Sequence, residues 1–272
     1  MLSLKLLSLA TLALARRSSA ANVKRGLAFA DSSNSGDISV AENTQVYWVY
    51  DWGTTVPDVL ANSGLRYIPM QWGIDGVESF AAMVEVQGSM AVLGFNEPDL
   101  DSQSNIDPVI AASLWIEYIQ PLKANGVRVG APAVSSSSSG MPWLAQFLES
   151  CTGCTFDFVP LHWYGDGCTA FSDYITSFHE QFPSWPLWVT EFASTNADVS
   201  GEWHDVAAST WYPDLFPAVV EEFCAQSIAL LDSLEWIEGY AWFAFYRQTP
   251  GSFYNLLDAN GQPNVLGQIY LQ

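Results

Sequence analysis

The stretch AVLGFNEPDL, residues 91–100, ends an apolar run with an Asn-Glu-Pro tripeptide. The run 91–95 is short and almost wholly apolar, which is typical of a strand buried on both faces. Glu97 therefore stands where a buried strand ends, and in α/β folds the carboxyl ends of parallel strands carry functional groups. An ordinary turn glutamate is the alternative. The rest of the chain decides between these two interpretations.

Seven further runs of this kind alternate with polar loops and helical patterns. They are GLAFA (26–30), VYWVY (46–50), RYIPM (66–70), VRVGAP (127–132), FDFVPL (156–161), LWVTEF (187–192) and YAWFAF (240–245). Such runs, separated by helices, predict parallel strands covered by helices. Eight strand–helix units in roughly 250 residues is the size of one barrel. We therefore predict an α/β fold, a single-domain (β/α)8 TIM barrel spanning residues 26–272.

The clearest helix is predicted between Asp107 and Gly126. Asp107 has the side chain of an N-cap, Pro108 suits the first helical position, and Asn125-Gly126 ends the segment. Its apolar residues at four-residue spacing are Ile110, Leu114, Tyr118 and Leu122. A second helix is predicted over about 213–234.

The first 25 residues read as a secretory signal peptide and a short pro-segment. Lys5 precedes an apolar run over 6–15, and small residues follow at 20–21. The dibasic pair Lys24-Arg25 predicts a cut that leaves Gly26 as the first residue. We expect a secreted protein, extracellular or in the cell wall, without a membrane anchor.

The chain is strongly acidic. Its 9 basic and 29 acidic side chains give a net charge of −20. Removing the five basic residues up to Arg25 would leave 4 basic side chains against 29 acidic, a net charge near −25. This charge excludes nucleic acid and anionic membrane as partners, but it does not oppose a neutral substrate. We expect a monomer.

Four cysteines in an exported chain favour disulfides. Cys151-Thr-Gly-Cys154 would supply half of a zinc site, but the second half is missing. Of the three possible pairings, the spacing favours Cys151 with Cys154 and Cys168 with Cys224. All four are therefore expected to be oxidised, and neither a metal nor a cofactor is expected.

Glu97 and Glu191 fall at the carboxyl ends of the fourth and seventh runs. On a barrel these ends face the active site. The chain offers neither a serine nucleophile elbow nor a glycine-rich phosphate loop as a rival. Two glutamates facing one another can cleave a glycosidic bond, one protonating the leaving oxygen and one attacking carbon or activating water.

The strings GFNEPD (94–99), APAVS (131–135), DFVPLHWYG (157–165) and LWVTEFA (187–193) resemble glycoside hydrolase family 128, a clan A barrel family. The resemblance covers residues 26–272. It implies a retaining β-1,3-glucanase acting on glucan of the fungal cell-wall type, with Glu97 as acid/base and Glu191 as nucleophile.

Polar neighbours of the two glutamates extend the predicted site. Asn96 can donate to the sugar 2-OH, whose hydrogen bond strengthens in the transition state; a turn-forming asparagine is the alternative. His162 and Tyr164 lie two apart on the sixth run, so they share a face and can orient Glu191. The Ser135–Ser139 run predicts a flexible loop.

Tryptophans at strand ends are candidates for stacking on sugar rings. They are Trp52, Trp72, Trp163 and Trp242. Trp242 is favoured because the clan A barrels that the chain resembles place an aromatic residue at strand eight. Core packing stays open for all four, whereas Trp115, Trp188 and Trp236 are assigned to packing.

Two functions of different class remain. One is an endo-acting retaining β-1,3-glucanase, and the other is a non-catalytic glucan-binding barrel with a structural or recognition role in the cell wall. The presence of both glutamates favours the enzyme, because a binding protein needs neither an acid nor a nucleophile.

Overall fold

The structure is a computed structural model that describes residues 21–194, 216–250 and 252–272. The strands of this part are β1 (Arg25–Phe29), β2 (Trp48–Tyr50), β3 (Arg66–Tyr67), β4 (Ala91–Val92), β5 (Arg128–Val129), β6 (Val159–Gly165), β7 (Leu187–Ser194) and β8 (Ile237–Phe245). Each coincides with one of the apolar runs or overlaps it.

The strands form a ring of parallel neighbours. Six of them pair in the order β3-β2-β1-β8-β7-β6, and β4 pairs with β5. Parallel bridges between Met70 and Leu93 and between Gly130 and Phe158 join these two sheets at both edges. The predicted (β/α)8 architecture is confirmed.

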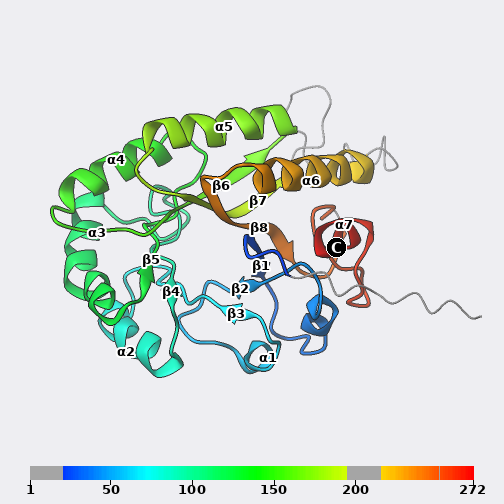
Figure 1. Cartoon of the computed structure of the whole chain (residues 1–272), viewed down its shortest axis with the longest axis horizontal. Helices are drawn as coiled ribbons and strands as arrows, with labels where there is room; N and C mark the ends of the chain where they lie inside the picture. The colour runs from blue at the N-terminus through cyan, green and yellow to red at the C-terminus, as the bar shows by residue number, and fades with distance from the viewer. Residues whose placement is uncertain (1–20, 195–215, 251) are drawn as a thin grey trace, which may run out of the picture.

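Helices cover the outside of the strands (Figure 1). They are α1 (Asp58–Ala61), α2 (Val77–Gln87), α3 (Pro108–Leu114), α4 (Gly140–Ser150), α5 (Cys168–Gln181), α6 (Phe216–Ser233) and α7 (Val265–Leu271). A short 3-10 helix, Asp37–Ala41, follows β1. Within the described ranges, none of the helices has the length and apolar character that a membrane span requires.

The helix predicted after Asp107 is present. The Asp107 carboxylate accepts from the backbone N–H groups of Val109 and Ile110, as an N-cap does. The segment continues through a π-turn, Trp115–Ile119, and a 3-10 turn, Gln120–Asn125, to Gly126. The predicted apolar stripe is only partly right. Ile110 is 56% exposed, and the buried face of the segment runs instead through Ala111, Trp115, Ile119 and Leu122.

Alternation along each strand divides the apolar core into two clusters. One lies between strands and helices and includes Leu27 and Phe29. The other consists of strand residues that point into the barrel, such as Ala28, Tyr50 and Phe158. Whether a strand side chain can reach the barrel mouth therefore depends on its position in this alternation.

One predicted disulfide forms and the other does not. Cys151 and Cys154 are bonded. Cys168 and Cys224 are free thiols, so the prediction that these two are paired is wrong. Cys168 begins α5 just after β6, whereas Cys224 lies about two turns into α6 and is buried against the core. Sequence spacing could not show that the two cysteines lie at different heights along their helices.

The dibasic pair Lys24-Arg25 belongs to the folded barrel. Arg25 is the first residue of β1, is 5% exposed, and donates to Tyr240 Oη and to the carbonyl oxygens of Tyr270 and Gln272. Lys24 Nζ donates to three carbonyl oxygens at the end of α6. A cut after Arg25 would detach these contacts, so the expected dibasic processing conflicts with the fold. The rest of the expected signal peptide, residues 1–20, lies outside the described residues.

Candidate active site

Glu97 and Glu191 meet at the carboxyl ends of the strands. Glu97 follows β4 and has a left-handed backbone, with φ of 40°. Its N–H donates to the Ala133 carbonyl at 2.7 Å, which fixes it against the loop after β5. Glu191 lies within β7. The two glutamates are 7% and 5% exposed, respectively, as expected of groups that act in a partly dry site.

Three donors hold the Glu191 carboxylate. Its Oε1 accepts from Trp52 Nε1 at 2.7 Å and from Tyr50 Oη at 3.3 Å, and its Oε2 accepts from Tyr164 Oη at 2.5 Å. Burial, and then the charge of Glu191, raise the pKa of both phenols far above the usual value, so they remain donors. Hydrogen bonds of this kind favour the ionised form of a carboxyl group.

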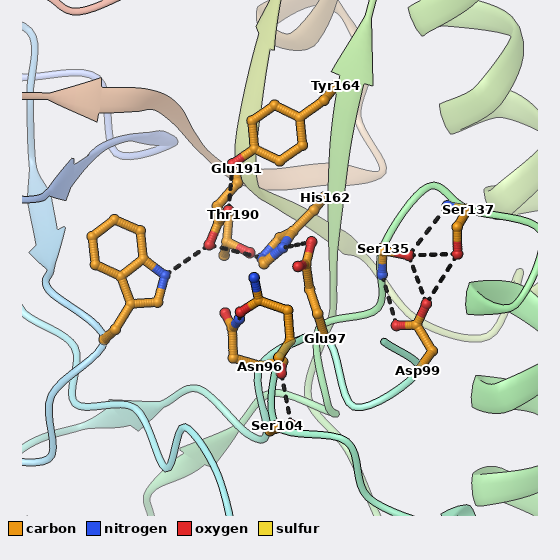
Figure 2. A network of polar contacts seen from close by, with 12 residues as sticks. Asn96, Glu97, Asp99, Ser104, Ser135, Ser137, His162, Tyr164, Thr190 and Glu191 are labelled. Carbon is orange, nitrogen blue, oxygen red and sulfur yellow. Dashed lines mark hydrogen bonds and ion pairs between the residues drawn. The ribbon is translucent and has the colours of Figure 1, made fainter. Parts of the chain in front are cut away.

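His162 lies between the two glutamates (Figure 2). Its Nδ1 is 2.9 Å from Glu97 Oε1, and its Nε2 is 3.4 Å from Glu191 Oε1 but has no hydrogen-bond partner among the described residues. Burial lowers the pKa of His162, but the negative charges of Glu191 and Glu97 outweigh it and raise the pKa above its usual value. The imidazole therefore couples the two carboxyl groups.

These three residues offer donor atoms within 4.8 Å of one another, a separation that a metal ion could bridge. The hydrogen bond of the ring goes from Nδ1 to Glu97, while Nε2 lies 3.4 Å from Glu191 Oε1. Metal binding also needs a neutral imidazole, whereas the raised pKa favours the protonated one. The arrangement suits a shared proton better than a cation.

Asn96 is buried beside Glu97. Its Nδ2 group donates to Gln103 Oε1 at 3.3 Å, which engages one of its two N–H bonds. Its buried Oδ1 has no partner among the described residues. The expected donation from Asn96 to a sugar 2-OH stays a prediction.

Asp99 ties the loop after β4 to the loop after β5. Its carboxylate accepts from the N–H and Oγ of Ser135 and from Ser137 Oγ (Figure 2). It also accepts from Ser139 Oγ. The prediction of a flexible serine loop is wrong, because these hydrogen bonds fix it. Since Asp99 is two residues from Glu97, the same contacts help to hold that glutamate.

Of the four tryptophans predicted to bind substrate, two lie at the site. Trp52 is half-buried against Glu191, and Trp72 is 38% exposed and lines the same pocket as Trp52. Trp163 packs against Phe171 and Phe223 on the helix-facing side of β6. It alternates with His162 and Tyr164, so the prediction that it contacts substrate is wrong.

The prediction that Trp242 contacts substrate is also wrong. It is fully buried between Phe192 and Phe223, and its Nε1 donates to the Tyr254 carbonyl. The next residue on β8, Phe243, faces the site instead. Its ring centroid is 5.9 Å from that of Trp52 and 5.4 Å from that of Tyr164.

Sequence reasoning missed Tyr50, Phe243 and Asp99. Tyr50 ends the second apolar run, so its place at the strand end could have identified it. Strict alternation fails for Phe243, because the register of β8 against β1 shifts between Trp242 and Phe245. Asp99 carries no local signal, because its partners are about 36 to 40 residues away.

The glycosyl hydrolase catalytic core family model matches residues 26–270. The chain belongs to this family. This glycosyl hydrolase is also 32% identical over 254 residues to alkali-sensitive linkage protein 1 of Schizosaccharomyces pombe, covering 91% of the chain but only 44% of that relative's length.

Solved structures place the glycosyl hydrolase within glycoside hydrolase family 128, as its sequence strings indicate. It is similar to an endo-β-1,3-glucanase from Lentinula edodes (30% identity, TM-score 0.73, 92% of this chain and 100% of that chain). It is also similar to a curdlan-specific exo-β-1,3-glucanase from Blastomyces gilchristii (28% identity, TM-score 0.75, 93% of this chain and 100% of that chain). A third similar structure is an endo-β-1,3-glucanase from Amycolatopsis mediterranei in complex with laminaritriose (29% identity, TM-score 0.72, 91% of this chain and 98% of that chain).

Proposed function

We propose that the protein hydrolyses β-1,3-glucan with retention of configuration, Glu191 acting as nucleophile and Glu97 as acid/base. The observation that carries this proposal is the pair of buried carboxyl groups, with oxygens within 4.8 Å of one another, at the mouth of a family 128 barrel. Retaining glycosidases keep their carboxyl groups about 5 to 5.5 Å apart, whereas inverting ones leave roughly 6.5 to 9.5 Å for a water molecule.

Glu191 is suited to attack. The hydrogen bonds from Trp52, Tyr50 and Tyr164 fix its carboxylate and aim its oxygens. In the first step an oxygen of Glu191 bonds to the anomeric carbon, and the bond to the glycosidic oxygen breaks. The result is a covalent glycosyl-enzyme.

Glu97 and His162 hold and transfer the proton that the reaction needs. Burial lowers the pKa of His162, but the charges of Glu191 and Glu97 outweigh it and raise the pKa, so this ring can hold a proton 2.9 Å from Glu97 Oε1. Glu97 gives this proton to the departing oxygen in the first step. In the second step it takes a proton from the water that attacks the anomeric carbon, which releases Glu191.

We further propose that the enzyme cuts within glucan chains and is exported. The endo-acting neighbours from Lentinula edodes and Amycolatopsis mediterranei support internal cutting, although the neighbour from Blastomyces gilchristii is exo-acting. Export rests on the signal-peptide pattern in the first 20 residues.

The test follows laminarihexaose hydrolysis by proton NMR. The first product should carry the β configuration, and its length distribution reports internal or terminal cutting. Glu191→Ala should lose all measurable turnover on laminarihexaose, and azide should restore part of the activity on an activated aryl laminarioside by giving the α-glycosyl azide. Glu97→Ala should lose about 10²- to 10⁴-fold in kcat/KM, less for substrates with good leaving groups.

Glu222→Gln, on the exposed side of α6, is the matched control and should behave as wild type. An α-configured first product would mean inversion and would remove Glu191 from its role. Binding of laminarihexaose without any cleavage would favour the glucan-binding barrel instead.

A further inference from the structure

Trp52 contacts Glu191 from the turn that follows β2, residues 51–55, and its backbone there is unusual. Its φ is 62°, in the left-handed region that a bulky side chain rarely adopts, and its Nε1 donates to Glu191 Oε1 at 2.7 Å. Among the described residues the next donors to this oxygen are farther away, Tyr50 Oη at 3.3 Å and His162 Nε2 at 3.4 Å. The closest hydrogen bond to Glu191 Oε1 therefore comes from a residue that other contacts must keep in a disfavoured conformation.

Asp51 and Tyr67 supply such contacts on both sides of Trp52. The Asp51 carboxylate accepts from the Gly53 N–H at 3.1 Å, so it closes the turn around Trp52. The same oxygen, Oδ1, accepts from Tyr67 Oη at 2.5 Å. Tyr67 Oη also lies 3.0 Å from the carbonyl oxygen of Gly53 and 3.1 Å from that of Thr55. One phenol oxygen thus contacts three residues of the turn.

The Tyr67 phenol keeps the proton that its contact with Asp51 needs. Burial, and then the hydrogen bond to Asp51 and the charge of Asp51, raise the pKa of Tyr67 far above its usual value. A hydroxyl has one proton, and the carboxylate is the strongest of the three acceptors around this one. Tyr67 therefore stays a donor to Asp51 at neutral pH.

Tyr67 itself lies outside the site. It is on β3, opposite Val49 of β2, and both side chains belong to the layer between strands and helices. Tyr50, the residue after Val49, points into the barrel instead. Tyr67 can therefore affect the reaction only through the turn that it holds.

The rest of the turn is anchored independently of Tyr67. The Met70 N–H donates to the Gly53 carbonyl at 2.8 Å, and Gln87 Nε2, at the end of α2, donates to the Thr54 carbonyl at 2.8 Å. These hydrogen bonds remain when the Tyr67 hydroxyl is removed. Its removal should therefore loosen the part of the turn that carries Trp52 without unfolding the loop.

We propose that Asp51 and Tyr67 are positioning residues, which hold Trp52 in its left-handed conformation and thereby aim its indole N–H at Glu191. The proposal rests on the proposed function for the role of Glu191 as nucleophile. When the turn is loosened, Trp52 can return to a negative φ, which rotates its indole away from Glu191. A nucleophile that is no longer held in place attacks more slowly, although the substrate still binds.

The kinetic test starts from Tyr67→Phe, which removes the hydroxyl and keeps the ring. It should lower kcat on laminarihexaose about 10-fold and change KM less than twofold. Trp52→Phe should lower kcat about 10- to 100-fold. In the Trp52→Phe background, adding Tyr67→Phe should lower kcat by less than a further twofold, because the N–H that Tyr67 aims is already absent. Tyr118→Phe, on the turn Trp115–Ile119 outside the site, is the matched control and should behave as wild type.

Asp51 provides a second pair of variants in case Tyr67→Phe folds poorly. Asp51→Asn retains an acceptor oxygen for Tyr67 and should lose less kcat than Asp51→Ala, which retains none. Equal losses of kcat in the two Asp51 variants would overturn the proposal. Losses of Tyr67→Phe and Trp52→Phe that multiply in the double variant would also overturn it, because they would mean a merely structural role for Tyr67.

Nuclear magnetic resonance of the indole N–H groups separates this proposal from the proposed function. The signal that Trp52→Phe removes belongs to Trp52, and its hydrogen bond to a carboxylate places it downfield. Tyr67→Phe should move this signal upfield, whether or not the enzyme is active, as the hydrogen bond to Glu191 weakens. If the wild type cleaves nothing, the proposed function fails, but this shift would still support the positioning of Trp52 by Tyr67. An unmoved signal would overturn that positioning even in an active enzyme.

Discussion

Nδ1 of His162 lies 2.9 Å from Oε1 of Glu97, in a ring that is fully buried. Burial lowers the pKa of His162, but Glu191 and Glu97 outweigh it, so the folded-state pKa exceeds the usual value of about 6.5. The stabilisation linked to its charge is therefore complete below about pH 6.5 and is lost as the pH rises through the folded-state pKa.

The decrease in the free energy of unfolding caused by His162→Gln should accordingly be largest at low pH. Urea unfolding between pH 5 and 9 measures the difference in the free energy of unfolding, which should shrink as the pH rises. His179→Gln, on α5 and outside the site, controls for the loss of an imidazole elsewhere. A difference that stays constant over this range would contradict the prediction.

Asp99→Ala should impair both stability and catalysis. It removes the acceptor of the hydrogen bonds from Ser135, Ser137 and Ser139, which costs about 1 to 3 kcal/mol. Glu97 loses part of its support, so kcat should fall about 10-fold or more. Ser137→Ala removes a single partner and should have a much smaller effect. A fall in melting temperature with unchanged kcat would limit Asp99 to a structural role.

Thiol titration should find two free cysteines in the denatured chain, because Cys151 and Cys154 are bonded while Cys168 and Cys224 are not. In the folded protein Cys168 should react first. Burial raises the pKa of both thiols, but only Cys224 is fully enclosed. Cys168→Ser should remove the fast reaction. Finding no thiol in the denatured chain would mean that these two cysteines pair after all.

Arg25→Ala should lower the free energy of unfolding by about 1 to 3 kcal/mol, because it leaves the buried carbonyl oxygen of Tyr270 without its donor. Circular dichroism melts measure this loss. Lys24→Ala should cost less, since its amine is only partly buried. N-terminal sequencing of exported protein should still find Lys24 and Arg25. A chain beginning at Gly26 with an unchanged melting temperature would contradict both expectations.

The sequence predicted the barrel and both glutamates because each depends on local pattern. A buried parallel strand is an apolar run, and the residue that follows it lies at the barrel mouth whatever the helices do. His162 and Tyr164 were predicted for the same reason, since residues two apart share a face. Tyr164 indeed reaches Glu191, whereas the hydrogen bond of His162 goes to Glu97.

The wrong predictions concern residues whose role depends on which face of a strand they occupy or on contacts with distant parts of the chain. Trp242 lies inside the eighth apolar run and Trp163 just after the sixth, but both face the helices. Composition alone does not distinguish the two faces of a strand buried on both. The Asp99 cluster and the free thiols of Cys168 and Cys224 depend on contacts between distant segments.

The left-handed backbone of Glu97 has an evolutionary consequence. A φ of 40° costs a residue with a Cβ atom roughly 1 kcal/mol or more, which glycine would not incur and asparagine would incur less. For a barrel under selection only to bind glucan, replacement of this residue by glycine or asparagine would relieve the strain. The glutamate at position 97 is thus disfavoured by the backbone, and the proposed catalytic role of its carboxyl group accounts for it.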